Sequence, residues 1–220
     1  MKKTLTLLVF VMASFFALDV QAQWDTGADL VTSYVWRGTK FGTGPAIQPW
    51  AEYSTGGFAV GAWGSYGFAN DVELGDAGEA DLYASYGLDL SESAALSLTV
   101  TDYYFPGSMY FDGASHSFEP MLGLEVGSFS LTAAYMINKS PGADISDTYL
   151  EAGFNVGSVD LFVGAGDGQY TIDGDFDLCN VGIGTSKEIK ITDSFSLPIS
   201  GTAILNPSTE QFHIVVGISL

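Results

Sequence analysis

The sequence predicts an all-β protein: a closed antiparallel transmembrane β-barrel of about 12 strands, with 10–14 strands considered. Segments of about ten residues alternate apolar and polar side chains, and each is bounded by Gly, Ser, Asp, Asn or Pro. Tight turns and longer polar loops join these segments in alternation. The last segment, residues 212–220, has one wholly apolar side and suits the closing strand of such a barrel.

The N-terminus has the features of an export signal. Lys2 and Lys3 precede an apolar run over residues 5–18, and small residues follow as far as Ala22. The apolar run is shorter than the roughly 20 residues that a membrane-spanning helix needs. We therefore predict a cleaved signal peptide at residues 1–22 and an outer-membrane β-barrel at residues 23–220.

The barrel segments follow one another to the C-terminus. We expect strands at residues 28–37, 45–54, 58–68, 79–90, 95–105, 117–126, 129–137, 148–156, 159–166, 176–188, 194–205 and 210–220. Tight turns are expected near 55–57, 91–93, 127–128, 157–158 and 191–193, and longer loops at 38–44, 69–78, 106–116, 138–147 and 167–175. The weakest patterns, at 159–166 and 184–193, leave the strand number uncertain by two. An even number of strands with both termini on the turn side is typical of bacterial outer-membrane barrels.

Residue parity separates an apolar outer face from a polar inner face. On the last strand Phe212, Ile214, Val216, Ile218 and Leu220 share one side, which we expect to meet lipid. The polar residues expected on the inner face are Glu52, Asp81, Glu119, Glu125, Glu151, Asn155, Asp160 and Glu210. The lumen is therefore predicted to be acidic.

Aromatic residues are expected to form belts at the two membrane interfaces. The belt near the long loops would contain Tyr34, Trp36, Tyr66, Phe68, Tyr103, Tyr104, Phe105 and Tyr135. The belt near the turns would contain Phe58, Phe129 and Phe195. The alternative is the ordinary preference of Tyr and Phe for strands.

Charge excludes one class of partner. Without the signal the chain keeps five basic residues against 25 acidic ones, a formal charge of −20. Phosphate contacts need a basic face, so nucleic-acid binding is not expected. Cys179 is the single cysteine, so no intramolecular disulfide can form, and we expect a small buried or lipid-facing residue there in preference to a reactive thiol.

Several segments of the first half resemble one family. They are residues 31–38 (VTSYVWRG), 44–49 (GPAIQP), 57–65 (GFAVGAWGS), 79–84 (EADLYA) and 102–107 (DYYFPG). This ordered set resembles the TorF-like porin family of small exported β-barrels; in the second half only the hairpin rhythm matches. The resemblance implies an outer-membrane barrel with channel activity.

Arg37 is the basic residue that the pattern places inside the barrel, near the long-loop rim. We expect it to pair with Glu52 or Asp81 on neighbouring strands. One hypothesis is that Arg37 shapes the field at a constriction; the other is a structural ion pair between the first hairpins. The candidate lumen residues are Arg37, Glu52, Asp81, Glu119 and Glu151, and a closed network of these with Tyr83 would let little solute pass.

Catalytic and metal sites have weak support. His116, Ser117 and Glu119 are the residue types of a hydrolase, but adjacent strand residues point to opposite faces. Asp173, Asp175 and Asp177 resemble the start of a calcium loop that lacks its later glycine and glutamate, so a solvated acidic loop is the default. We expect no enzyme activity and no cofactor.

The expected function is passive diffusion of small solutes, cationic or neutral, through a narrow acidic pore. The expected partners are outer-membrane lipid, lipopolysaccharide and, through the C-terminal strand, the barrel-assembly machinery. One alternative is a non-conducting structural or surface-recognition barrel. A more remote alternative is an outer-membrane hydrolase.

Overall fold

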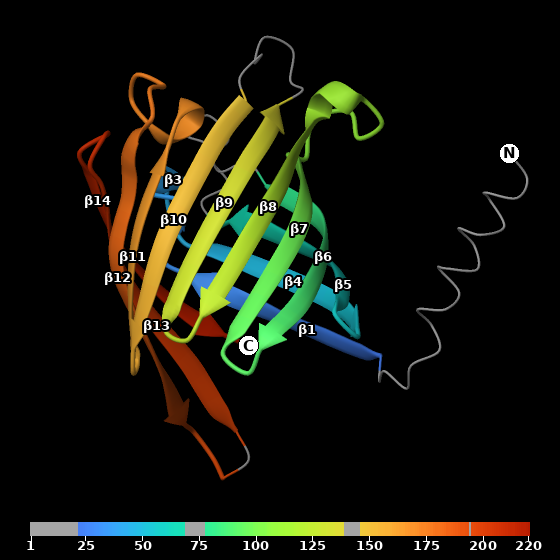
Figure 1. Cartoon of the computed structure of the whole chain (residues 1–220), viewed down its shortest axis with the longest axis vertical. Coiled ribbons are helices and arrows are strands. Elements are labelled where there is room, and N and C mark those ends of the chain that lie inside the picture. The colour runs from blue at the N-terminus through green and yellow to red at the C-terminus, as the bar shows by residue number, and fades with distance from the viewer. Residues whose placement is uncertain (1–21, 69–77, 139–145, 194) are drawn as a thin grey trace, which may run out of the picture.

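The computed structural model describes residues 22–68, 78–138, 146–193 and 195–220. Twelve antiparallel strands form one closed barrel, with short turns at one end and longer connections at the other (Figure 1). Nearly all of the predicted signal peptide and most of the predicted loops at 69–78 and 138–147 lie outside the described residues. The predicted fold class is confirmed.

The barrel strands pair in the ring order β1-β14-β13-β12-β11-β10-β9-β8-β7-β6-β5-β4, and β4 pairs with β1 to close it. Their bounds are β1 (Gln23–Val31), β4 (Ala46–Thr55), β5 (Phe58–Gly67), β6 (Glu79–Ser91), β7 (Ala94–Tyr104), β8 (His116–Val126), β9 (Phe129–Asn138), β10 (Ser146–Val156), β11 (Val159–Gly166), β12 (Asp177–Lys190), β13 (Ser196–Asn206) and β14 (Gln211–Ser219). A separate two-stranded sheet consists of β2 (Tyr34–Trp36) and β3 (Thr39–Phe41). The short 3₁₀ helices are η3 (Gly113–Ser115) and η4 (Gly168–Tyr170).

The predicted strands match the observed ones with one exception. Ten of them differ at their ends by one or two residues, which is the usual uncertainty of strand boundaries, and 159–166 coincides with β11. The first was wrong: it was predicted at 28–37, but β1 ends at Val31 and the chain then leaves the wall. The alternating pattern of 34–37 belongs to the separate hairpin β2–β3, which has the same period of two as a barrel strand.

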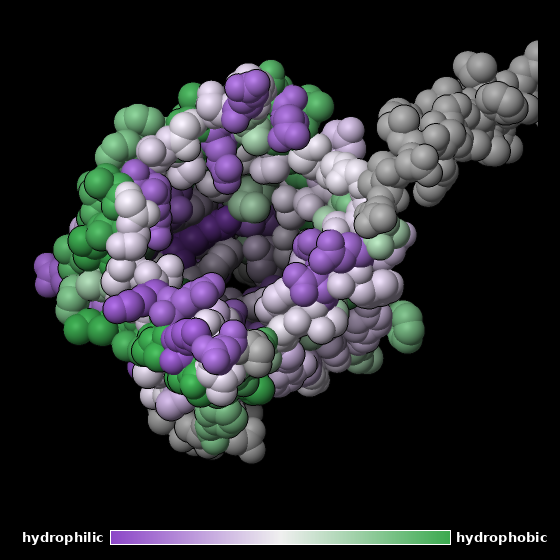
Figure 2. Space-filling model, turned by 90° about the horizontal axis from the view of Figure 1, so that it is seen from below, coloured by the Kyte–Doolittle hydropathy of each residue, from purple (hydrophilic) through white to green (hydrophobic). Residues whose placement is uncertain are grey.

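The outer wall is apolar, as the parity predicted. Phe212, Ile214 and Val216 of β14 are exposed, and so is Leu131 of β9, which lies opposite Leu124. Directly opposite residues in an antiparallel pair share a face, so the register carries this apolar surface from strand to strand. Figure 2, viewed from the turn end, shows hydrophobic residues mainly along the left and lower outside and hydrophilic residues around and inside the hollow mouth.

The inner wall is acidic. The register places carboxylates of the barrel strands on the inner face at Asp25, Asp29, Glu52, Glu79, Asp81, Asp89, Glu119, Glu125, Asp147, Glu151, Asp160, Asp177 and Glu188. These include six of the seven predicted inward acids, and Asn155 also lies on this face. The prediction for the seventh, Glu210, was wrong, because this residue lies in the turn before β14 with a φ of 57°.

The aromatic belts were partly right. Tyr66, Phe68, Phe105 and Tyr135 are exposed near the long loops, and Phe58, Phe129 and Phe195 are exposed near the turns. Tyr104 lies on the outer wall but packs against Tyr110 and His116. Three residues were assigned to the wrong face: Tyr34, Trp36 and Tyr103 lie inside the barrel, where Trp36 packs against Tyr103. Aromatic side chains fill the lumen because the hairpin β2–β3 enters it.

Candidate functional site in the barrel lumen

The hairpin β2–β3 turns inward from the seam of the barrel. Beyond β1, Thr32 still pairs with β14, its N–H donating to the carbonyl of Val216 at 2.9 Å. The hairpin reverses at Arg37 and Gly38, with φ values of 50° and 80°. Two consecutive residues with positive φ are the feature of the tight turn that suits twisted strands. A turn of this kind places Arg37 at the tip of the hairpin.

The hairpin crosses the whole bore of the barrel. At one side the hydroxyl of Tyr34 hydrogen-bonds Glu79 on β6. At the other side Gly38 lies so close to β12 that a Cβ on it would stand 1.9 Å from the carbonyl oxygen of Cys179. Five strands separate β6 from β12 in either direction around the ring, so these contacts lie on opposite walls. The hairpin therefore narrows the lumen as a bar across its diameter.

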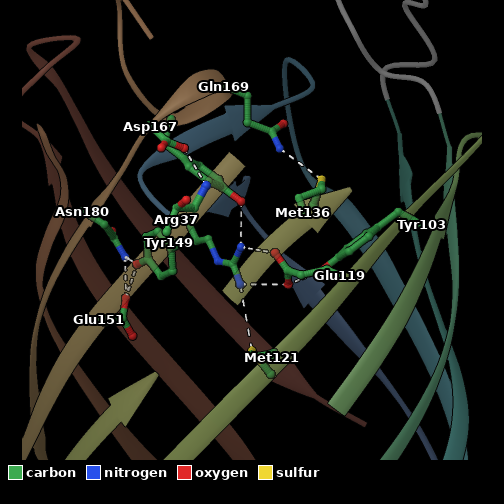
Figure 3. Close-up of polar contacts among 12 residues, drawn as sticks. Arg37, Tyr103, Glu119, Met121, Met136, Tyr149, Glu151, Asp167, Gln169 and Asn180 are labelled. Carbon is green, nitrogen blue, oxygen red and sulfur yellow. Dashed lines mark hydrogen bonds and ion pairs between the residues drawn. The ribbon is translucent and has the colours of Figure 1, made fainter. Parts of the chain in front are cut away.

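Arg37 holds the tip of this bar to the wall through Glu119 of β8. Its Nη1 lies 2.5 Å from Oε2 and its Nη2 lies 3.0 Å from Oε1 of that carboxylate (Figure 3). The side chains are 8% and 2% exposed, so the pair is shielded from solvent. Nη1 also donates to the hydroxyl of Tyr170 at 2.7 Å. A bidentate pair of this kind fixes both the distance and the orientation of the two groups.

Aromatic rings surround the guanidinium. Its central carbon lies 4.5 Å from the ring centre of Trp36 and 4.3 Å from that of Tyr149. Tyr170, on η4, packs against both rings, with centroid distances of 5.5 and 5.3 Å. Burial raises the pKa of Tyr170, so its hydroxyl stays protonated. The cation is thus neutralised by Glu119 and enclosed by π faces, which favour a cation.

The network extends across the wall on both sides of Arg37. Tyr103 donates to Glu119 at 3.1 Å, and Tyr149 donates to Glu151. Asn180 of β12 donates to the Tyr149 hydroxyl at 2.8 Å and to Glu151 at 2.9 Å. Side chains from β7, β8, β10, β12 and η4 therefore close this side of the lumen at the level of the bar (Figure 3).

The predicted lumen residues form two groups. Arg37, Glu119 and Glu151 belong to the network just described. Glu52 lies apart and accepts a hydrogen bond of 2.8 Å from Tyr83. Asp81 lies beside Tyr103 on β7. The predicted pairing of Arg37 with Glu52 or Asp81 was wrong, because Arg37 stands at a hairpin tip and reaches across to β8.

Several residues of the site were not singled out from the sequence. Tyr149 lies two positions from Glu151 and therefore on the same face, so parity alone would have placed it inside. Gly38, directly after Arg37, is a residue type that marks turns, so the sequence did contain a signal for a chain reversal at this point. Tyr170 had no such signal, because it lies in a loop between two strands and enters the lumen only through tertiary packing.

On the turn side the lumen is hollow and acidic. One recess is lined by Glu125, Glu151, Asn155 and Asp160 together with Ser130. A second is lined by Ser85, Asp89, Ser97 and Thr99 on the wall of β6 and β7. We call this turn-side half of the lumen the vestibule, and its mouth is the opening in Figure 2. Solutes that enter it meet carboxylates and hydroxyls.

The other chemical candidates are placed as follows. His116 faces the outer wall and pairs with Asp102 at 2.9 Å, whereas Ser117 faces inward opposite Tyr103. The carboxylate Oδ1 atoms of Asp173 and Asp177 accept from the backbone N–H groups of Asp175 and Leu178. In the described part of the chain no group of three or more His, Cys, Asp or Glu residues is placed to hold a metal ion. Within the same residues no helix has the length and apolar character needed to cross a membrane.

Solved structures with a similar course of the chain include the outer membrane protein OprD, the protein OccAB3 and a porin. OprD from Pseudomonas aeruginosa is 10% identical with a TM-score of 0.37, over 92% of this chain and 66% of OprD. OccAB3 from Acinetobacter baumannii is 9% identical with a TM-score of 0.39, over 93% of this chain and 65% of OccAB3. A porin refined at 1.8 Å is 17% identical with a TM-score of 0.32, over 91% of this chain and 76% of that porin.

This chain therefore spans slightly less than two thirds of OprD and OccAB3. No curated protein matches it. The resemblance to TorF-like porins stays a prediction. A family model described as "Bacterial protein of unknown function (Gcw_chp)" matches residues 21–197, and the chain belongs to that family.

Proposed function

We propose that the protein is an outer-membrane β-barrel that lets small cationic or neutral solutes diffuse through its acidic lumen. The exposed apolar wall supports the membrane location. Large apolar side chains cover it on successive strands, among them Leu82, Leu98, Leu122, Leu131, Leu150, Val163, Ile183 and Ile214. A surface of this extent is unusual for a soluble monomer and suits contact with hydrocarbon. The partners of the protein would be outer-membrane lipid and lipopolysaccharide. Its last strand, β14, would bind the barrel-assembly machinery.

The charge of the inner wall is the observation that supports cationic or neutral solutes over anionic ones. The register turns thirteen carboxylates of the described strands inward. The basic residues of those strands are Lys187 and Lys190, both near the turn end of β12. The hairpin adds Arg37, which is already neutralised by Glu119, and Lys40, which is exposed. Rings of carboxylates attract cations and repel anions, so the lumen favours cations.

The hairpin β2–β3 sets the size limit. A barrel of about 12 strands has a narrower bore than the 16–18-stranded porins that hold a wide water channel. The bar across this bore, with the Arg37 network beside it, leaves less room than the wall alone would. The proposed solutes are therefore small.

Recording from purified protein in planar lipid bilayers tests the proposal. With a salt gradient across the membrane, we expect discrete conductance steps and a reversal potential that shows cation preference. Steps with anion preference would contradict the acidic-lumen mechanism. Thermal unfolding on a detergent gel, in which a folded barrel migrates differently before heating, verifies that the recorded protein is folded.

A second candidate is a non-conducting structural or surface-recognition barrel. The complete burial of Tyr170 and the near-complete burial of Glu119 and Tyr149 favour it, because the bar is packed against the wall on this side. Folded protein that gives no steps in the bilayer, while a variant with the bar displaced does, would support this candidate over the open pore.

A further inference from the structure

Glu79 and Asp81 form a buried pair of carboxylates on the inner face of β6. They occupy consecutive inward positions, two residues apart, on the side of the lumen that the hairpin reaches with Tyr34. Glu79 is 4% exposed and Asp81 is 6% exposed. Neither contacts Arg37, whose two terminal nitrogens, Nη1 and Nη2, donate to Glu119.

The pair lacks a positive partner. Three ion pairs of the described residues, Arg37 with Glu119, His116 with Asp102 and Lys190 with Asp193, do not include either carboxylate. Glu79 receives the hydroxyl of Tyr34, and Asp81 receives the backbone N–H of Tyr104. The Oδ1 atom of Asp81 is buried and has no hydrogen-bond partner. A buried carboxylate oxygen without a partner is costly, so a group that binds it would stabilise the site.

The surroundings of the pair suit a cation. Trp63 on β5 and Tyr103 on β7 lie directly opposite Asp81 across the two strand pairs. Opposite residues have Cβ atoms about 4.5–5.5 Å apart, which brings these rings beside the carboxylate. Tyr34 packs on Trp63, with ring centroids 5.5 Å apart. Aromatic faces attract cations, and this attraction adds to that of the carboxylates.

We propose that Glu79 and Asp81 form a binding site for a small monovalent cation, either an alkali-metal ion or a primary ammonium. This inference rests on the proposed function: a cation that diffuses through the lumen would bind at this site, beside the hairpin. Two carboxylates with neutral oxygen neighbours do not make the larger acidic set typical of a calcium site. In the described residues no cluster of three metal-ligating side chains includes them.

Quenching of tryptophan fluorescence by thallium(I), which replaces potassium, tests the site. The folded barrel in detergent is titrated with thallium acetate at constant ionic strength. We expect saturable quenching that Asp81→Asn weakens by about tenfold or more in affinity, the effect of losing one charged ligand. Trp63→Phe should remove most of the saturable signal, which shows that the ion binds beside that ring.

Competition experiments distinguish the two classes of cation, an alkali-metal ion and a primary ammonium. Potassium and methylammonium are each added to the thallium-loaded protein, and the one that restores fluorescence at lower concentration identifies the preferred class. Asp193→Asn is the matched control, because Asp193 is a fully exposed carboxylate in the turn between β12 and β13 and should leave the affinity unchanged.

Two results would overturn the site. One is quenching that rises linearly with thallium and is equal in wild type and Asp81→Asn. The other is an infrared C=O band of a protonated carboxyl that disappears in Asp81→Asn and persists in wild type at the highest thallium concentration, since the missing partner would then be a proton. Because binding is measured in detergent, a barrel that binds thallium without conducting refutes only the pore, and a cation-selective pore without saturable binding refutes only the site.

Discussion

Arg37 and Glu119 are joined by two hydrogen bonds of 2.5 and 3.0 Å although 82 positions separate them in the chain. One belongs to the hairpin that crosses the lumen and the other to the wall strand β8. The pair therefore connects the bar to the barrel, and its strength decides whether the hairpin stays across the bore.

Removal of the charge on Glu119 should destabilise the barrel. Glu119→Gln leaves a buried guanidinium without its carboxylate, and breaking a buried ion pair in this way costs about 3–5 kcal/mol. The measurement is the free energy of unfolding from urea titration in lipid vesicles. Glu125→Gln, an exposed carboxylate of the same strand, should change it by about 0.5 kcal/mol or less. Equal effects of the two variants would mean that the Arg37 pair contributes nothing specific.

The same variant should widen the passage. If the bar is held by Arg37 and Glu119, Glu119→Gln should raise the mean single-channel conductance relative to wild type, while Glu125→Gln should not. A conductance unchanged by Glu119→Gln would show that the hairpin does not control the bore.

Cys179 reports the position of the hairpin. It is the single cysteine, is 0% exposed, and its carbonyl lies against Gly38. Gly38→Ala should displace the hairpin, because the new Cβ would overlap that carbonyl and φ is 80°. We expect labelling of Cys179 by a water-soluble maleimide to become at least several-fold faster.

Gly107→Ala is the matched control for this experiment. Gly107 also has a positive φ, 113°, but no atom lies within 4 Å of a Cβ built there. Cys179 should be labelled in Gly107→Ala at the same rate as in the wild type. Equal acceleration in both variants would point to general loosening of the barrel instead of hairpin displacement.

Arginine substitutions distinguish the two faces of one strand. Leu131 is exposed on the outer wall, and the next residue, Thr132, faces inward opposite Glu151. Leu131→Arg should destabilise the barrel in lipid by up to about 2–4 kcal/mol, the effect of a cation on the lipid face. Thr132→Arg should cost much less, because it meets water and a carboxylate. The free energy of unfolding in lipid vesicles measures both effects. A larger loss of stability in Thr132→Arg than in Leu131→Arg would contradict the assignment of the two faces.

A reversal of charge in the vestibule should change ion selectivity. Glu125→Lys adds a positive charge to an acidic recess of the lumen, so the reversal potential should move toward anion preference. Asp193→Lys makes the same change of net charge at a fully exposed side chain between β12 and β13. It should shift the reversal potential less, and an equal shift would mean that net charge, and not lumen charge, sets selectivity.

The sequence by itself determined the wall. Its period of two assigned residues such as Leu131 and Glu151 to opposite faces, because successive side chains of a strand alternate. Turn residues such as Gly127 and Gly157, both with positive φ, marked where strands reverse. The prediction of an acidic lumen followed from the same alternation, and the strand register places six of the seven predicted acids on the inner face.

Only the tertiary structure decided what fills the lumen. Tyr34 and Trp36 have the alternation of a lipid-facing strand, and the pattern does not record that the chain leaves the wall after Val31. Whether those rings meet lipid or Tyr103 depends on contacts between segments far apart in the chain, which local periodicity does not contain. The partner of Arg37 was mispredicted for this reason, since a hairpin tip inside a closed barrel can reach any strand and packing selects Glu119.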